Sequence, residues 1–346
     1  MDRPLRAREP QPAEEAARRL ARIDGRGYKA YREIEGAWRL QPGVVLCIDR
    51  VQADPYAPPS AARLQVDLDR SGLPAGLCRG SAGTVAFCDF LARKAAAAAS
   101  GGLVVHGPGA EVLARSTVCV EPDEPGLLEL RLGVALPASG RRIRGREAER
   151  LLLDRAARLA AATLTDRGVE AAALRAHVEA VEDQRALRAQ LEERGLVAFV
   201  AEGAVLPRAS GVSQEPLDPR RAVPFTSPES LRVRLRAPHA GEVEGMGLPA
   251  GVTLLCGGGF HGKSTLLEAL ARCVYDHPPG DGRELCVTRA DAVKLRAEQG
   301  RWVGGVDISA FLGPLPGGGR TEAFTTANAS GSTSQAASLV LALIHI

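Results

Sequence analysis

One nine-residue segment, residues 257–265, constrains the fold of this chain more than any other feature of its sequence. It fits the pattern G-x-x-x-x-G-K-[ST], whose glycines let successive backbone N–H groups close around phosphate oxygens. Its Lys263 is one of only four lysines among 44 basic residues, and a compact ammonium reaches outer phosphates better than a forked guanidinium does. The predicted phosphate-binding loop consists of Gly257, Gly258, Gly259, Phe260, His261, Gly262, Lys263, Ser264 and Thr265.

The residues on either side follow the order that such a loop requires. Residues 252–256 are a short apolar run, which predicts a buried parallel strand. After the loop, Leu266, Ala269 and Leu270 recur at helical spacing, so a helix beginning at Thr265 is expected to face the phosphates. A nucleotide is therefore the predicted ligand, and the hydroxyl of Ser264 is the predicted Mg²⁺ ligand. The alternative is an ordinary glycine-rich turn between a strand and a helix.

Composition sets the outer limits. The 346 residues are 45 % hydrophobic and 25 % charged, as expected for a globular chain of about two domains. The net charge of +3 is too small to predict a nucleic-acid partner by itself. The seven dispersed cysteines never form C-x-x-C, which favours buried free thiols over disulfides or zinc. No stretch approaches the roughly 18 apolar residues of a membrane-spanning helix, and the expected location is cytoplasmic.

Changes in composition and in hydrophobic periodicity divide the chain into three predicted parts. Residues 1–12 are rich in Pro and Arg and are predicted to be disordered. Residues 13–165 are predicted to form a mixed α+β domain, with strands at 44–48 and 127–135 and helices at 87–99 and 146–162. Residues 166–346 are predicted to form the α/β domain that carries the loop. This domain includes a polar helix over 169–194, which stops at Gly195, and a strand over 231–235.

A second motif, residues 329–335, opens a predicted helix near residue 346. Its sequence Ala-Ser-Gly-Ser-Thr-Ser-Gln places small hydroxyl residues and a glycine at a helix start, where free N–H donors and the helix dipole favour an anion. Ser and Thr are also ordinary N-caps, so capping alone is an alternative explanation. Beside a phosphate-binding loop, the segment resembles a degenerate form of the L-S-G-G-Q signature of ABC-type ATPases.

Together these segments resemble the bacterial family of predicted ATPases of the ABC class, which has a relative in kinetoplastid mitochondrial RNA metabolism. The resemblance implies a P-loop fold of ABC-ATPase type behind a family-specific N-terminal domain, with ATP and Mg²⁺ as cofactors. It also implies a homodimer that holds two ATP molecules between two heads. The residues implied to contact the partner's ATP are Ser330, Gly331, Ser332, Thr333 and Gln335. The matching segments, besides the loop, are residues 23–31, 49–55, 140–147, 179–200, 210–213, 223–231, 277–284, 291–296, 305–309 and 328–335.

The sequence departs from this family at one point. An ABC-type ATPase needs an Asp and a Glu after the signature, to order the Mg²⁺ water shell and to polarise the attacking water. Here the last acidic residue, Glu322, precedes the signature, and His345 lies too early to serve as the switch histidine. We expect either a sequence truncated before the Walker B strand, which the apolar ending favours, or a nonhydrolytic nucleotide-responsive binding module. The catalytic residues stay unassigned, and efficient hydrolysis by this chain is not expected.

Four arginines in the N-terminal domain form the arginine cluster, Arg141, Arg142, Arg144 and Arg146. They are candidates for contacting an RNA or DNA backbone, and a solvated turn paired with nearby carboxylates is the alternative. The predicted function is an ABC-class ATPase that couples ATP-driven dimerisation to nucleic-acid binding, with RNA as the favoured partner. A P-loop kinase is disfavoured, because the signature-like segment has no place in one.

Two further groups of residues each have a functional and a structural interpretation. Tyr28 and Tyr31, beside Lys29, combine aromatic and basic groups as stacking surfaces do. Their i, i+3 spacing nevertheless favours one buried helical face. Arg283 is a candidate for reaching the nucleotide or a partner head, although a structural turn is the favoured interpretation of residues 277–284.

Overall fold

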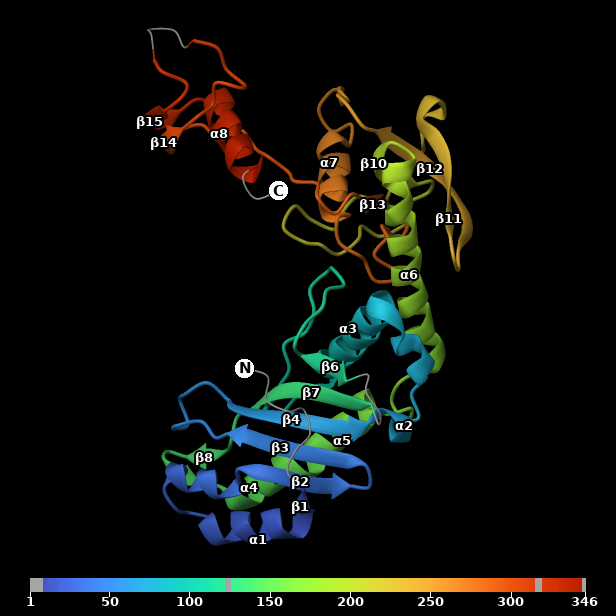
Figure 1. The fold of residues 1–346 in the computed structure, drawn as a ribbon. Coiled ribbons are helices and arrows are strands. Elements are labelled where there is room, and N and C mark those ends of the chain that lie inside the picture. Colours follow the sequence, from blue (N-terminus) through green and yellow to red (C-terminus); the bar gives the residue numbers. More distant parts are fainter. Residues whose placement is uncertain (1–8, 122–125, 315–318, 344–346) are drawn as a thin grey trace.

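The structure is a computed structural model that describes residues 9–121, 126–314 and 319–343. The N-terminal part is built on a seven-stranded sheet and the C-terminal part on a four-stranded sheet, with one long helix running between them (Figure 1). Both parts combine helices with strands, so the predicted mixed α/β fold class is confirmed.

Seven strands form the large sheet: β1 (Gln11–Pro12), β2 (Gly36–Gln41), β3 (Val44–Arg50), β4 (Ser60–Asp67), β5 (Leu103–Val104), β6 (Val118–Glu121) and β7 (Leu127–Val134). Their order is β1-β2-β3-β4-β7-β5, and β6 also pairs with β7. The β1–β2 pair is parallel and the other pairs are antiparallel. Val44, Leu46 and Ile48 of β3 are buried on one face, because successive side chains of a strand point to opposite faces, and Cys47 is buried on the other face.

Helices cover the core face of this sheet. They are α1 (Ala13–Ile23), η1 (Tyr28–Ile34), α2 (Leu68–Ser71), η2 (Ala75–Cys78), α3 (Gly80–Ala98), α4 (Gly145–Glu149), the π-helical η3 (Arg150–Arg155) and α5 (Ala156–Thr163). A short hairpin of β8 (Ala138–Ser139) and β9 (Arg142–Ile143) precedes α4. In Figure 1, α1, α4 and α5 lie together on one face of the sheet.

The long helix α6 (Ala171–Glu193) takes part in two hydrophobic cores. Leu174, Val178 and Val181 pack into the core of the N-terminal domain. Two turns further on, Leu187 and Leu191 pack into the core of the C-terminal sheet. The helix therefore joins the two parts of the molecule by continuous packing and not through a flexible linker.

The C-terminal sheet contains β11 (Arg232–Ala237), β12 (Gly241–Pro249), β10 (Leu196–Ala201) and β13 (Val287–Thr288), in that order and all antiparallel. The short η4 (Glu229–Leu231) leads into β11. Helix α7 (Lys263–Arg272) packs on the face opposite α6. Successive residues of β10 separate the two faces, because Phe199 joins the core under α6 whereas Val200 joins the core under α7.

A fourth core lies further along the chain. It joins the hairpin of β14 (Arg301–Val306) and β15 (Phe324–Ala329) to helix α8 (Gly331–Leu343). In Figure 1 this unit stands apart from α7 and from the four-stranded sheet. Among the described residues, none of the helices is both long and apolar enough to cross a membrane.

Most predicted elements are confirmed, among them the strands beginning at residues 44 and 127 and the polar helix α6. The buried strand predicted over 252–256 is wrong. These residues form no strand, and Val252 and Leu254 are more than four-fifths exposed, because none of the strands in the described part of the chain pairs with them. The disorder predicted through residue 12 is wrong for Gln11 and Pro12, which pair with β2.

Candidate nucleotide-binding site

The loop at residues 257–265 leads into helix α7, and its last three residues form the first turn of that helix. Gly262 caps the helix with a φ of 80°, a left-handed conformation that favours glycine. Helix α7 starts at Lys263, two residues earlier than predicted, so the N–H groups of Lys263, Ser264 and Thr265 lie in its first turn and have no partner within the helix. This end of the helix carries the positive pole of its dipole, which favours a bound anion.

The shape of the loop depends on small residues. A Cβ added at Gly258 would come within 3.2 Å of the His261 ring, and one at Gly257 within 3.7 Å of the Lys263 side chain. Phe260 has a φ of 61°, so a bulky side chain occupies a left-handed conformation that costs on the order of 1–3 kcal/mol. Its side chain is fully exposed. Conformations of this kind concentrate where a loop binds a ligand.

Lys263 points back over its own loop. Its ammonium donates a hydrogen bond to the Gly258 carbonyl oxygen, so a positive charge is held inside the curve of the backbone. The loop itself contains no acidic residue. This set of groups, which combines free N–H donors with one ammonium, fits phosphate oxygens.

The site offers less to a metal ion than to a phosphate. Within the described ranges, no group of three or more His, Cys, Asp or Glu residues could hold a metal. At the helix start the loop supplies two side-chain hydroxyls, those of Ser264 and Thr265, and the sequence pattern assigns Ser264 to the metal. Mg²⁺ commonly keeps few protein ligands and takes the rest from phosphates and water, so this donor set fits Mg²⁺ bound together with a nucleotide.

The far end of α7 is held by Arg188 of α6, which the sequence analysis did not identify. The Arg188 guanidinium donates to the carbonyl oxygens of Cys273 and Tyr275, both at 3.2 Å, and to that of Thr288 at 3.1 Å. It also forms an ion pair with Asp276 at 2.7 Å. A cation at a helix C-terminus meets the negative pole of the dipole, so Arg188 fixes α7 at the end opposite the loop.

The N-terminal domain contacts the same segment. Arg272 at the end of α7 pairs with Glu111 at 3.0 Å, and the amide of Val112 donates to the Asp276 carbonyl oxygen at 2.8 Å. The buried Gln184 of α6 both donates to and accepts from the backbone of His277, at 2.9 and 2.7 Å. Residues 272–277 thus connect the helix of the loop to α6 and to the N-terminal domain.

The turn after this segment is buried and structural. Arg283 is 1 % exposed and pairs with Asp281 at 2.6 Å, so it does not reach a nucleotide, and the structural interpretation of residues 277–284 is confirmed. Beside it, the Cys286 thiol and the His277 ring lower the pKa of the Cys273 thiol, whereas the contact with Cys273 and then burial raise the pKa of the Cys286 thiol. All seven cysteines are free. Cys256 is exposed, whereas the sequence analysis predicted buried thiols.

The signature-like segment lies at the start of α8, as predicted. Ser330 is its N-cap: its hydroxyl accepts from the Thr333 amide at 3.4 Å and contacts the Thr333 hydroxyl at 3.0 Å. Ser332 and Gln335 are exposed, whereas Thr333 and Ser334 are buried. The side chain of Leu343 and the residues after it, His345 included, lie outside the described part of the chain.

The arginine cluster is exposed, in and around β9. Arg144 pairs with Glu147 at 2.8 Å, and Arg142 donates to the Gly25 carbonyl oxygen at 3.1 Å. By contrast, Tyr28 and Tyr31 are buried edge to face, with ring centroids 5.1 Å apart, and their hydroxyls donate to backbone carbonyls. Their interpretation as core residues is therefore confirmed.

Comparison with known proteins agrees with this layout. Residues 13–167 match the family described as ATPase of the ABC class N-terminal, and residues 170–345 match the ABC_ATPase P-loop domain. The chain is also 32 % identical over 144 residues to the uncharacterized protein MJ1628 of Methanocaldococcus jannaschii. That match covers 39 % of this chain and 32 % of the relative, so it spans about a third of the relative's length. The chain belongs to the ABC-class ATPase family, as a P-loop domain preceded by the family's N-terminal domain.

Proposed function

We propose that this chain binds Mg-ATP at residues 257–265, with the phosphates on the concave side of the loop. The observation that carries the proposal is Lys263, whose ammonium is held over the loop at the N-terminus of α7. An arriving phosphate replaces the Gly258 carbonyl as its acceptor and meets the free N–H groups of the first turn. The Ser264 hydroxyl then serves as the protein ligand of Mg²⁺.

We further propose that ATP joins two copies of the chain, with the exposed residues at the start of α8 contacting the ATP of the partner copy. Ser330, Gly331, Ser332 and Gln335 take this role, whereas the buried Thr333 acts within its own helix. Two observations support the arrangement. Ser330, Ser332 and Gln335 are exposed and Gly331 is half-buried at a helix N-terminus, and in Figure 1 α8 stands apart from the α7 of the same chain.

The N-terminal domain is proposed to bind nucleic acid, RNA in the first place, through the arginine cluster. The exposure of all four side chains supports a backbone-contacting role. Residues 272–277 and α6 offer a packed connection from the loop to that domain, so a shift of α7 on nucleotide binding would reach it. The free cysteines favour a reducing compartment, and we place this activity in the cytoplasm.

Calorimetry with the purified chain tests the nucleotide site. Lys263→Ala is expected to weaken Mg-ATP binding roughly 10- to 100-fold, which is the range for losing a charge-assisted hydrogen bond. Lys263→Arg should weaken it less, through poor fit. Lys29→Ala, which removes an exposed lysine of η1, is the matched control and should bind as the unmodified chain does. Unchanged affinity in Lys263→Ala would rule out this loop as the ATP site.

Light scattering tests the dimer. Addition of Mg-ATP is expected to double the particle mass, and Ser332→Arg should prevent this without reducing ATP affinity in the monomer. A mass that does not change at saturating Mg-ATP would contradict the proposed homodimer while leaving the nucleotide site intact.

A further inference from the structure

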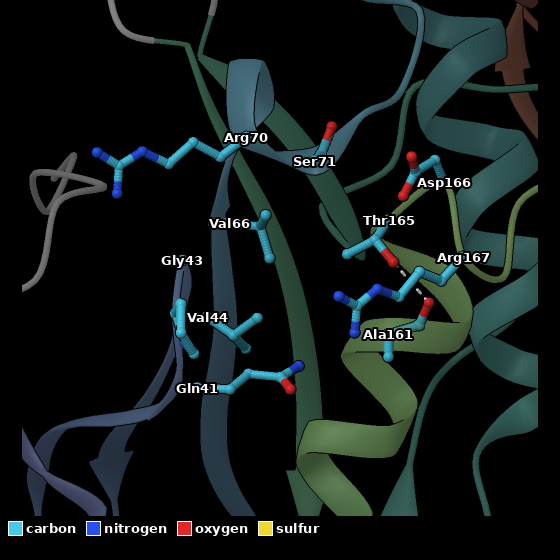
Figure 2. A pocket seen from close by; sticks show the side chains of 11 residues that line it. Gln41, Gly43, Val44, Val66, Arg70, Ser71, Ala161, Thr165, Asp166 and Arg167 are labelled. Atoms are coloured by element: carbon cyan, nitrogen blue, oxygen red, sulfur yellow. Dashed lines mark hydrogen bonds between the residues drawn. The ribbon is translucent and has the colours of Figure 1, made fainter.

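A cavity in the N-terminal domain has the features of a ligand site. Its volume is about 220 Å³, and it lies where the turn between β2 and β3, the end of β4 and the segment after α5 meet (Figure 2). None of its lining residues belongs to the phosphate-binding loop, the signature-like segment or the arginine cluster. We propose that this cavity binds a ring-bearing organic phosphate no larger than a mononucleotide.

Part of the cavity lining is apolar. Val44 of β3 and Val66 of β4 are directly opposite each other in the ladder, so their side chains lie next to each other on the same face of the sheet. Both are lining residues and both are at most 3 % exposed. Ala161 of α5 supplies a third apolar side chain, from the helix that faces the sheet. A planar ring packs on such a surface with little loss of hydrogen bonding.

One cation, the exposed Arg167, is directed over the apolar part of this otherwise polar cavity. Figure 2 shows the Arg167 guanidinium directed between Val44 and Ala161, with the Gln41 amide turned toward it. Within the described chain Arg167 has no ion pair and donates no hydrogen bond. The carboxylate next to it in sequence, that of Asp166, faces Gly72 instead. A guanidinium stacks on planar rings through its face and pairs with phosphate through its edge. The Gln41 amide adds one donor group and one acceptor for the edge of the ring.

The size and the mouth of the cavity limit the ligand. A volume of about 220 Å³ lies below the roughly 300–1,000 Å³ of sites that enclose a whole drug-sized ligand. Only a ring is therefore enclosed, and the phosphate stays near the opening. Arg70 lines the cavity with its side chain directed outward in Figure 2, and among the described residues it forms one ion pair, with Asp67 at 3.8 Å. This guanidinium is available to a phosphate at the mouth.

The walls of the cavity are fixed by close contacts. The Asp166 amide donates to the Ser71 carbonyl oxygen at 2.9 Å, and the Thr165 hydroxyl donates to the Ala161 carbonyl oxygen at 2.8 Å. Gly72 has a φ of 73°, and a Cβ added there would lie 2.4 Å from the Asp166 carboxylate. These contacts fix the position of the cavity walls, and the cavity ends four residues before α6 begins.

Calorimetry on the full chain carrying Lys263→Ala tests the proposal, with AMP, UMP and inorganic phosphate as probes. The Lys263→Ala change weakens the phosphate-binding loop, and the two monophosphates lack the outer phosphates that Lys263 would contact. AMP or UMP is expected to bind with a Kd below about 1 mM, the lower end of specific affinity. Adding Arg167→Gln should weaken binding about tenfold or more, and Ala161→Leu, which fills the cavity, should do the same.

Arg158→Gln is the matched control, because Arg158 is an exposed arginine of α5 that donates only to the Asp154 carbonyl oxygen and lies outside the cavity. It should leave the affinity unchanged. Thermal unfolding of each variant confirms that it is folded. Three results would overturn the proposal: no binding of either monophosphate at millimolar concentration, equal affinity in the Arg167→Gln variant, or inorganic phosphate binding as tightly as AMP.

Discussion

Removal of Arg188 tests whether α7 is held from its far end. Arg188→Ala deletes an ion pair of 2.7 Å to Asp276 and three hydrogen bonds to backbone carbonyls, from a side chain that is 14 % exposed. Asp276 keeps Arg185 at 3.0 Å, so its charge is not left unpaired, and the cost stays below the 3–5 kcal/mol of an orphaned buried charge. The lost charged hydrogen bond to Asp276, together with part of the contribution of the three carbonyl contacts, should lower the free energy of unfolding by about 3 kcal/mol.

Arg185→Ala is the matched control, because it removes an arginine from the same helix and the same Asp276. Arg185 is 31 % exposed, and its other contact is the exposed Ser81 at 3.2 Å, so about 1 kcal/mol is expected. The difference of about 2 kcal/mol corresponds to roughly 30-fold in an equilibrium. Hydrogen exchange of the α7 amides should therefore be about 30-fold faster in Arg188→Ala than in Arg185→Ala.

A positioning role also predicts an effect on the ligand. Arg188→Ala should weaken Mg-ATP binding although residue 188 does not contact the loop, and Arg188→Lys should restore part of the affinity through its charge. Equal exchange rates in Arg188→Ala and Arg185→Ala, or unchanged Mg-ATP affinity in Arg188→Ala, would refute the reasoning.

Two further predictions concern other parts of the chain. Replacing all four residues of the arginine cluster by Gln should flatten the slope of log affinity for single-stranded RNA against log salt concentration by up to about 3 units, because each phosphate contact contributes about −0.7. Filter binding at several salt concentrations measures this slope. An identical slope in the variant would show that the cluster does not contact the RNA backbone. Iodoacetamide at pH 8 should alkylate the exposed Cys256 first, because burial raises the pKa of the thiols of Cys78 and Cys88 to about 12 and leaves little thiolate. Mg-ATP should slow the labelling of Cys256, which adjoins the loop, and mass spectrometry that finds Cys78 labelled as fast would contradict the assignment.

Local patterns in the sequence predicted what depends on local geometry. The polar helix could be predicted from its periodicity and from Gly195, which stops it with a φ of 65°. The loop could be predicted because its glycines and lysine are contiguous. The structure of residues 252–256 could not be predicted in the same way. An apolar run indicates a propensity to form a strand, but it does not indicate whether a neighbouring strand is present to pair with it.

Contacts between distant residues escaped prediction for a related reason. Arg188 and Asp276 are 88 residues apart, and Glu111 and Arg272 are 161 apart. Nothing in one chain says which of its many arginines meets which carboxylate. The i, i+3 spacing of Arg185 and Arg188 places both on one face of α6, but it does not say which carboxylate they meet.

Two hydrophobic cores pack around the same 23-residue helix, α6, so a movement of one core is transmitted to the other. At 1.5 Å per residue it is a rod of about 35 Å, so a tilt of about 10° at its C-terminal half would displace the other end by about 6 Å. A small rotation of the C-terminal sheet, which leaves the packing around α7 intact, would then move the N-terminal sheet by several ångströms. A nucleotide that rocks the smaller domain slightly would thereby redirect the surface that carries Arg141 and its neighbours.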